Sequence, residues 1–227
     1  MLTSIPDNLN KEITKDLKTY FDTENLVIED FKFSSGGCIN NTGTLITNRG
    51  EVFIKWNSKS RFPNLFEIEK EGLELLSNTK SGLKIPRVLS LGEDSDHIFM
   101  ILELIKSTSR KPTYWSDLGK GLASLHRNSN SHFGLDYDNY IGSLIQKNSN
   151  ETNWIDFFIQ NRLLFTFQMA YDKGLMTKSE EIKIRSLIRE LPDICPNDIE
   201  PSLLHGDLWS GNLMVGSDGA PVLIDPA

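Results

Sequence analysis

The chain carries LHGDLWSGNL at residues 204–213, and the other motifs take their meaning from this segment. An apolar pair leads into a short polar turn, and an apolar residue follows the turn. Within the turn, the carboxylate of Asp207 and the carboxamide of Asn212 stand five positions apart. On their own these two residues could be ordinary turn formers, because Asp, Asn and the neighbouring glycines favour tight turns.

A second motif follows a few residues later. The apolar run PVLI at residues 221–224 precedes Asp225 and predicts a short buried strand. Such a strand would bring the Asp225 carboxylate to the segment that holds Asp207 and Asn212. Oxygen ligands of this kind suit Mg²⁺, a hard cation that retains waters and shares substrate phosphates. We therefore predict that Asn212 and Asp225 hold Mg²⁺.

The spacing of Asp207 and Asn212 equals that of the kinase catalytic loop, in which the Asp accepts the substrate hydroxyl proton and the Asn binds a metal ion. His205, Trp209 and Asp225 favour this interpretation over a simple turn. HGDLWSGN and LIDPA together resemble the fructosamine (ketosamine) kinases, a branch of the aminoglycoside-phosphotransferase group. The WSGN ending is the specific part of this resemblance.

The resemblance implies an α+β, bilobal protein-kinase-like fold. We expect residues 1–105 to form an N-lobe with an antiparallel sheet, a glycine loop and one long helix. Residues 106–227 are expected to form a mainly helical C-lobe. Family members continue beyond the Asp-Pro-Ala with helices that complete the larger lobe, so we expect the C-lobe of this chain to lack those helices. Whether the chain is a truncated form or lacks part of its acceptor site stays open.

Hydrophobic periodicity predicts the elements of both lobes. Predicted helices cover residues 11–21, 62–77, 114–127, 154–173 and 178–189. Predicted strands cover residues 26–33, 42–47, 51–56, 85–91 and 97–102. The helix over 154–173 is apolar on most sides and is expected to be largely buried, and residues 192–201 are expected to be irregular.

The segment between the first two strands contains a glycine pair. A glycine pair in a hairpin is usually only a turn, but its bare backbone N–H groups can approach phosphate oxygens where a Cβ would clash. Cys38 is either simply a small loop residue or, if exposed beside such a site, carries a stabilised, redox-reactive thiolate. The family resemblance covers this segment and implies that the nucleotide is bound by Gly36, Gly37, Cys38, Ile39 and Asn40.

Lys55 ends the strand VFIK, a pattern in which kinases direct a lysine at the ATP phosphates. A lysine on a strand is otherwise a solvated edge residue. A phosphate-binding lysine needs a carboxylate to fix it, and the resemblance selects Glu69 among four glutamates of the following helix. The apolar strand predicted over residues 97–102 is followed by Glu103 and resembles the kinase hinge. This resemblance implies that backbone groups of Glu103 and Ile105 meet the adenine.

Two further residues have open roles near the acceptor. His126 is either a cation at a helix end or a residue on the substrate side. Trp209 either stacks on the sugar ring or packs the loop. The segment over 133–148 follows the family pattern and is expected to form a loop or short hairpin over the acceptor site.

The resemblance implies an ATP- and Mg²⁺-dependent kinase that phosphorylates the sugar 3-hydroxyl of ketosamines, fructosamine or ribulosamine adducts, in protein-deglycation repair. Asp207 would be the catalytic base. One alternative is another small-molecule kinase, acting on an aminoglycoside, choline or a similar alcohol, which would lack the Trp209-Ser210 signature. A second alternative is a nucleotide-binding module without catalysis.

The composition limits the partners. A chain of 227 residues with 38% hydrophobic and 24% charged residues suits one globular unit or two intimate lobes. A net charge of −7 argues against nucleic-acid binding, and no apolar run approaches a membrane span. The N-terminus has no export signal, and Cys38 and Cys195 are too few for a disulfide framework. We expect a cytoplasmic protein whose partner is a free or protein-bound ketosamine.

Overall fold

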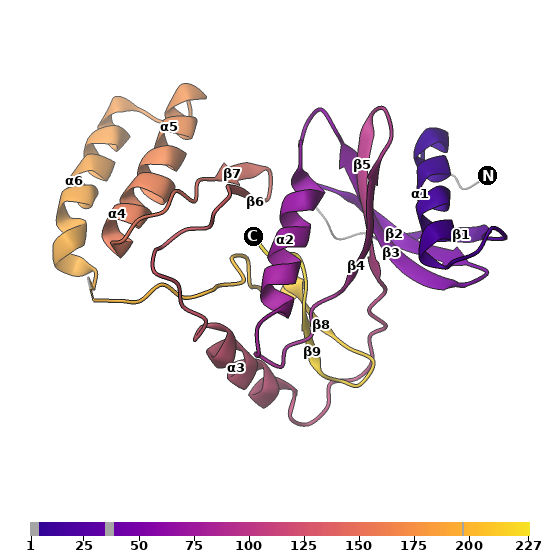
Figure 1. The fold of residues 1–227 in the computed structure, drawn as a ribbon. Helices are drawn as coiled ribbons and strands as arrows, with labels where there is room; N and C mark the ends of the chain where they lie inside the picture. The colour runs from indigo at the N-terminus through magenta and orange to yellow at the C-terminus, as the bar shows by residue number, and fades with distance from the viewer. Residues whose placement is uncertain (1–4, 35–38, 197) are drawn as a thin grey trace. The chain divides into compact units, whose positions relative to one another are not determined.

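A five-stranded antiparallel sheet dominates the N-terminal half of the computed structural model, which describes residues 5–34, 39–196 and 198–227 (Figure 1). The strand order is β1-β2-β3-β5-β4, and every neighbouring pair is antiparallel. All five predicted strands are present, with ends shifted by a few residues. Their bounds are Ile28–Phe33 (β1), Asn41–Thr47 (β2), Gly50–Ser58 (β3), Val88–Glu93 (β4) and His97–Glu103 (β5).

Two helices cover this sheet. Helix α1 (Asp7–Tyr20) begins four residues before the predicted helix and buries its apolar stripe against the sheet. Leu9, Ile13 and Leu17 of this stripe are fully buried. Burial of each such side chain contributes roughly 1.5–3 kcal/mol. The stripe therefore fixes α1 on the sheet.

Helix α2 (Leu65–Ser77) packs against β4 and β5. Phe66, Leu73 and Leu76 are buried and recur at helical spacing. Glu69 and Gly72 fall on the same side of the helix, since they stand three and six residues after Phe66. The sequence period of α2 thus turns one carboxylate toward the sheet.

A second, two-stranded sheet consists of β8 (Leu213–Val215) and β9 (Pro221–Leu223). The strand predicted over residues 221–224 is confirmed, and Val222 is fully buried. The backbone N–H of Leu223 donates to the carbonyl oxygen of Lys84 at 2.9 Å. This bond joins β9 to the segment between α2 and β4, so the last residues of the chain return to the first sheet.

The chain divides into two compact units. The first unit comprises Met1–Ala123 and His205–Ala227, and the second comprises Ser124–Leu204. Helix α3 (Tyr114–Leu125) begins in the first unit, where the Tyr114 hydroxyl donates to the Met214 carbonyl oxygen at 3.1 Å. The predicted division into lobes at residue 105 stays a prediction.

The second unit is mainly helical. Its hairpin and helices are β6 (Asn139–Ile141), β7 (Leu144–Gln146), α4 (Trp154–Phe158), the π-helical turn η1 (Ile159–Leu164), α5 (Phe165–Asp172) and α6 (Lys178–Ile194). The helix predicted over 154–173 is therefore interrupted by a wider turn. The predicted broad burial holds only in part: nine side chains of this stretch are partly buried and only four are buried. The four are Ile155, Phe157, Asn161 and Phe167.

Helix α6 extends five residues beyond its predicted end. It begins with a capping box in which Thr177 and Glu180 exchange side-chain and backbone bonds. Pro192 was expected to lie in an irregular segment, but it lies inside the helix. A proline removes one backbone donor and crowds the preceding turn, and the helix ends two residues after it.

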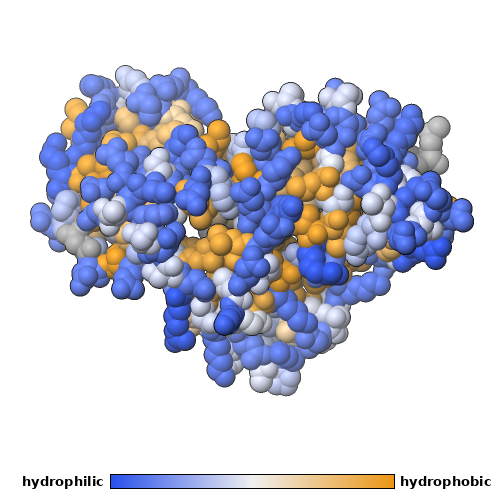
Figure 2. All heavy atoms as spheres, in the orientation of Figure 1, coloured by the Kyte–Doolittle hydropathy of each residue, from blue (hydrophilic) through white to orange (hydrophobic). Residues whose placement is uncertain are grey.

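Hydrophilic residues cover most of the surface visible in Figure 2, with apolar residues showing between them. Among the residues that the structure describes, no helix combines the length and apolar character needed to cross a membrane.

Candidate active site

The first unit brings Lys55, Glu69 and Asp225 together. Lys55 on β3 places its Nζ 2.5 Å from Glu69 Oε1 and in contact with Asp225 Oδ1. The Lys55 side chain is only 5% exposed and that of Glu69 is 11% exposed, whereas that of Asp225 is 47% exposed. One buried ammonium is thus shared by a carboxylate from α2 and a carboxylate that follows β9.

The charges in this cluster depend on one another. Burial acts to lower the pKa of Lys55, but the attraction of Glu69 and Asp225 outweighs it and holds that pKa above its usual value. Burial raises the pKa of Glu69, and the charge of Asp225 acts in the same direction against the attraction of Lys55. Lys55 therefore stays cationic, and Glu69 depends on Lys55 for its ionised form.

Asn212 connects the other two predicted oxygen-bearing residues. Its Nδ2 donates to the Asp207 carbonyl oxygen at 2.9 Å and to Asp207 Oδ2 at 3.1 Å. A longer bond of 3.4 Å reaches the carbonyl oxygen of Asp225. The Asn212 side chain is buried, so its amide group is held in one orientation. These bonds use the amide nitrogen and leave Oδ1 as the Asn212 atom suited to a cation.

The buried His205 side chain bonds this loop to the segment that follows β9. Its Nε2 donates to the Ile224 carbonyl oxygen at 3.0 Å, and its Nδ1 accepts from the Asp207 backbone N–H at 3.4 Å. These partners select the tautomer with the proton on Nε2. Burial lowers the pKa of His205, so the ring is neutral near pH 7. Both ring nitrogens are engaged, which makes Asp207 the better candidate base.

Two sharp backbone turns bring the polar groups to the cluster. Asp225 has a φ of +54°, in the left-handed region that Asp tolerates better than most residues. Gly206 has a φ of +87°, and a Cβ there would lie 2.0 Å from the Ala227 carbonyl oxygen. Only glycine therefore fits at position 206, where the two segments lie against each other.

Of the nucleotide-binding residues predicted between β1 and β2, the structure describes Ile39 and Asn40. Gly36, Gly37 and Cys38 lie outside the described residues. Asn57 Nδ2 donates to the Ile39 carbonyl oxygen at 3.0 Å and to Asn40 Oδ1 at 2.8 Å. Sequence reasoning missed this buried Asn57. Its signal is its position two residues after Lys55, which places both side chains on one face of β3.

In the predicted hinge, the backbone N–H and the side chain of Glu103 are both bonded to Arg87. The Glu103 backbone N–H donates to the Arg87 carbonyl oxygen at 3.0 Å, and the Glu103 side chain accepts from Arg87 Nε at 2.9 Å. An adenine contact at Glu103 would therefore use its carbonyl oxygen. Ile105 is half-buried. The hinge roles of both residues stay predictions.

The two predicted acceptor-side residues belong to different units. Trp209 is 60% exposed, and its ring lies so close to Gly211 that a Cβ there would come within 2.3 Å of it. Trp209 thus packs the loop and also exposes a ring surface. His126 is exposed in the second unit, and its role stays a prediction.

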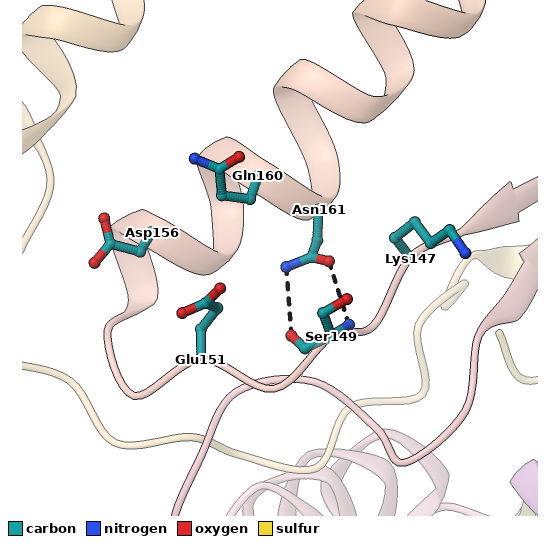
Figure 3. A pocket seen from close by; sticks show the side chains of 6 residues that line it. All are labelled: Lys147, Ser149, Glu151, Asp156, Gln160 and Asn161. Atoms are coloured by element: carbon teal, nitrogen blue, oxygen red, sulfur yellow. Dashed lines mark hydrogen bonds between the residues drawn. The ribbon is translucent and has the colours of Figure 1, made fainter.

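The second unit contains an open pocket of about 590 Å³ that no sequence signal predicted (Figure 3). Figure 3 shows Asn161 of η1 facing Ser149, with which it exchanges bonds of 3.2 and 3.4 Å. Those bonds hold the loop before α4 against the π-helical turn. The pocket contains none of the predicted site residues, and its lining residues are Lys147, Ser149, Glu151, Asp156, Gln160 and Asn161.

The donor set near Asp225 suits a hard cation with few protein ligands. Across the described ranges, no three His, Cys, Asp or Glu side chains are grouped as a metal-binding set. Mg²⁺ commonly takes one or two protein oxygens and completes its shell with water and phosphate. The Asp225 carboxylate and the Asn212 amide oxygen match that requirement.

The site combines a lysine on a strand, paired with a glutamate on a helix, with an Asp-Asn loop and an Asp that follows a strand. This combination is typical of protein-kinase-like phosphotransferases. The family follows from comparison with known proteins. The model of the fructosamine kinase family matches residues 9–227. The chain therefore belongs to the fructosamine kinase family, and the predicted family is confirmed.

Two curated relatives illustrate the similarity. A candidate ketoamine kinase of Enterococcus faecium is 34% identical over 208 residues, covering 88% of this chain and 73% of the relative. The chloroplastic protein-ribulosamine 3-kinase of Arabidopsis thaliana is 35% identical over 196 residues, covering 85% of this chain and 59% of the relative. The chain thus spans about three fifths to three quarters of the length of these relatives.

Solved structures confirm the predicted fold class. A candidate fructosamine-3-kinase from Haemophilus somnus is 27% identical with a TM-score of 0.82, covering 95% of this chain and 71% of that one. An aminoglycoside phosphotransferase crystallised with AMP-PNP and hygromycin B is 14% identical with a TM-score of 0.59, covering 95% and 70%. The second likeness concerns the fold alone.

Proposed function

We propose that this chain is an ATP- and Mg²⁺-dependent kinase that phosphorylates the sugar 3-hydroxyl of ketosamines. Ribulosamine or fructosamine adducts on small amines or proteins are its proposed substrates. One observation carries the proposal: Lys55 is held between Glu69 and Asp225, while Asn212 ties Asp225 to Asp207. The names of the relatives, ketoamine kinase and ribulosamine 3-kinase, support the substrate class.

Lys55 is proposed to bind the ATP phosphates. A lysine that neutralises phosphate must be cationic and fixed in direction, and its two carboxylate partners provide both properties. Asn57 supports the proposed phosphate loop, because it ties Ile39 and Asn40 to the strand that carries Lys55. Backbone groups of Glu103 and Ile105 are proposed to complete the nucleotide site at the adenine.

Asn212 and Asp225 are proposed to hold Mg²⁺ through Asn212 Oδ1 and the Asp225 carboxylate. Asp225 bonds Lys55 through Oδ1, so Oδ2 is the oxygen that can bind the ion before the bond to Lys55 is given up. When bound, Mg²⁺ neutralises charge on the phosphates during transfer. The half-exposed Asp225 can accept a hydrated cation without removing all of its water.

Asp207 is proposed to orient the acceptor hydroxyl and to take its proton. The side chain is half-buried. Its backbone N–H is held by His205, and its Oδ2 accepts from Asn212. The same contacts leave Oδ1 to face the acceptor. The exposed ring of Trp209, two residues further on, is proposed to stack on the sugar.

The test is ADP release with ribulosamine, fructosamine, choline and an aminoglycoside, with and without EDTA, together with equilibrium binding of Mg²⁺-ATP. We expect turnover with a ketosamine that EDTA abolishes. Turnover only with choline or the aminoglycoside would contradict the substrate class. Binding of Mg²⁺-ATP without turnover on any acceptor would contradict the kinase proposal and favour a non-catalytic nucleotide-binding module.

A further inference from the structure

Helix α2 lies against the chain directly beside Asp225. Gly72 stands three residues, about one helical turn, after Glu69 on the same face of α2. A Cβ built at Gly72 would lie 3.3 Å from Pro226 Cγ and 3.7 Å from Pro226 Cβ. The first of these distances is tighter than ordinary van der Waals contact. The missing side chain at position 72 therefore lets α2 approach the residue that follows Asp225.

The contacts around Asp225 form a closed ring. Glu69 bonds Lys55, and Lys55 bonds Asp225. Pro226 follows Asp225 and faces Gly72, which returns to Glu69 through one turn of α2. Two connections therefore relate α2 to Asp225: the ionic one through Lys55, and the close approach of Gly72 to Pro226.

The two connections differ in stiffness. Lysine and glutamate side chains have several rotatable bonds, so the ionic connection alone allows α2 a range of positions. Gly72 has no side chain to rearrange, and the ring of Pro226 fixes its own φ. With no side chain at position 72, α2 approaches Pro226 more closely than an alanine would allow, and the ionic connection operates at that separation.

We propose that Gly72 and Pro226 are positioning residues whose close approach sets the spacing at which Glu69 and Asp225 share Lys55. Their role in nucleotide binding rests on the kinase function proposed above. A glycine in the interior of a helix lowers helix stability relative to alanine. At position 72 the glycine provides the close approach to Pro226 that alanine would obstruct.

Gly72→Ala tests the proposal against a matched control, Gly119→Ala. Both changes add one methyl group to a helix interior and raise helix propensity. At Gly119 in α3 the added Cβ would meet nothing within 4 Å. The first measurement is acylation of Lys55 by acetic anhydride, followed residue by residue by mass spectrometry, because it needs no substrate and reports whether the two carboxylates still shield the amine.

We expect Lys55 to be acylated at least about threefold faster in Gly72→Ala and at the wild-type rate in Gly119→Ala, with both variants folded at the assay temperature. Pro226→Ala removes the Cγ atom that the new methyl group would meet. In the double variant Gly72→Ala/Pro226→Ala the acylation rate should return toward that of Pro226→Ala alone. Such non-additivity identifies a direct contact.

Equilibrium binding of Mg²⁺-ATP is the second measurement. Gly72→Ala should weaken it about tenfold and raise the Mg²⁺ concentration needed for half-saturation, while Gly119→Ala should leave both unchanged. Wild-type acylation of Lys55 in Gly72→Ala, or additivity in the double variant, would overturn the positioning role. Faster acylation in a protein that binds no Mg²⁺-ATP would support the positioning role and count against the kinase function alone.

Discussion

Replacing Lys55 by Met removes the cation that two carboxylates share and retains a side chain of similar length. Asp225 is 47% exposed, so water can solvate its charge after the change. Glu69 is only 11% exposed and loses the ammonium that lies 2.5 Å away. The energetic consequence of Lys55→Met should therefore appear mainly at Glu69.

Glu69 has two ways to respond to the loss. A buried carboxylate that stays ionised without a partner costs about 3–5 kcal/mol. Binding a proton instead costs about 1.4 kcal/mol for each pH unit above the ordinary pKa of 4.5. At pH 7 that amounts to about 3.4 kcal/mol. The free energy of unfolding should therefore fall by about 3 kcal/mol at pH 7, with Glu69 partly or fully protonated.

The pH dependence has a definite sign. In folded Lys55→Met the raised pKa of Glu69 keeps its proton, whereas the unfolded chain loses that proton above pH 4.5. The folded state then binds more protons, so the free energy of unfolding falls as pH rises. Relative to the wild type, the destabilisation should be small near pH 5 and grow by up to about 1.4 kcal/mol per pH unit toward pH 7.

Urea unfolding at pH 5, 6, 7 and 8 measures this difference, and hydrogen exchange of β3 and α2 peptides assigns it to the first unit. Lys55→Met/Glu69→Gln is the control, since it removes the titrating group and should lose the pH slope. A destabilisation by Lys55→Met that is the same at all four pH values would refute the reasoning. So would a variant as stable as the wild type at pH 8.

Three further changes test other parts of the chain. Asp207→Asn should lower kcat by about 10²–10⁴, the usual contribution of a general base, with little change in urea midpoint; near-full turnover in the ADP-release assay would contradict the assigned base. The lowered pKa of His205 means that the unfolded chain binds its proton more readily, so wild-type stability should fall as pH drops below about 6.5. His205→Gln should flatten that slope in pH-dependent urea titrations, and an unchanged slope would exclude His205 as its source. Gly134→Ala should lower the melting temperature, because φ is +104° there and the new Cβ would lie 2.5 Å from the Asn148 carbonyl oxygen; melting like that of Gly119→Ala would argue against this strain.

Residues that obey a local pattern could be predicted from the sequence. The VFIK pattern placed Lys55 on a strand, and the family motif selected Glu69 from four candidates. The structure shows this Glu69 bonded to Lys55. The close approach of Gly72 to Pro226 could not be predicted, because it joins segments more than 150 residues apart and involves no polar group. The continuation of α6 past Pro192 was missed because proline usually marks a helix end, and local composition does not reveal which turn can accept it.

The exposure of the three paired side chains indicates which of them can change partner. Glu69 and Lys55 are almost fully buried, so separating them would leave a buried charge without compensation. Asp225 is about half exposed, and water can replace part of what Lys55 provides. Asp225 is therefore the residue able to exchange Lys55 for a hydrated cation at small cost, and Asn212, bonded to its backbone, lies beside it. Loading of the proposed site with Mg²⁺-ATP should accordingly move Asp225 while the Lys55–Glu69 pair stays in place, because only the half-exposed carboxylate can give up its ammonium without remaining unpaired in the interior.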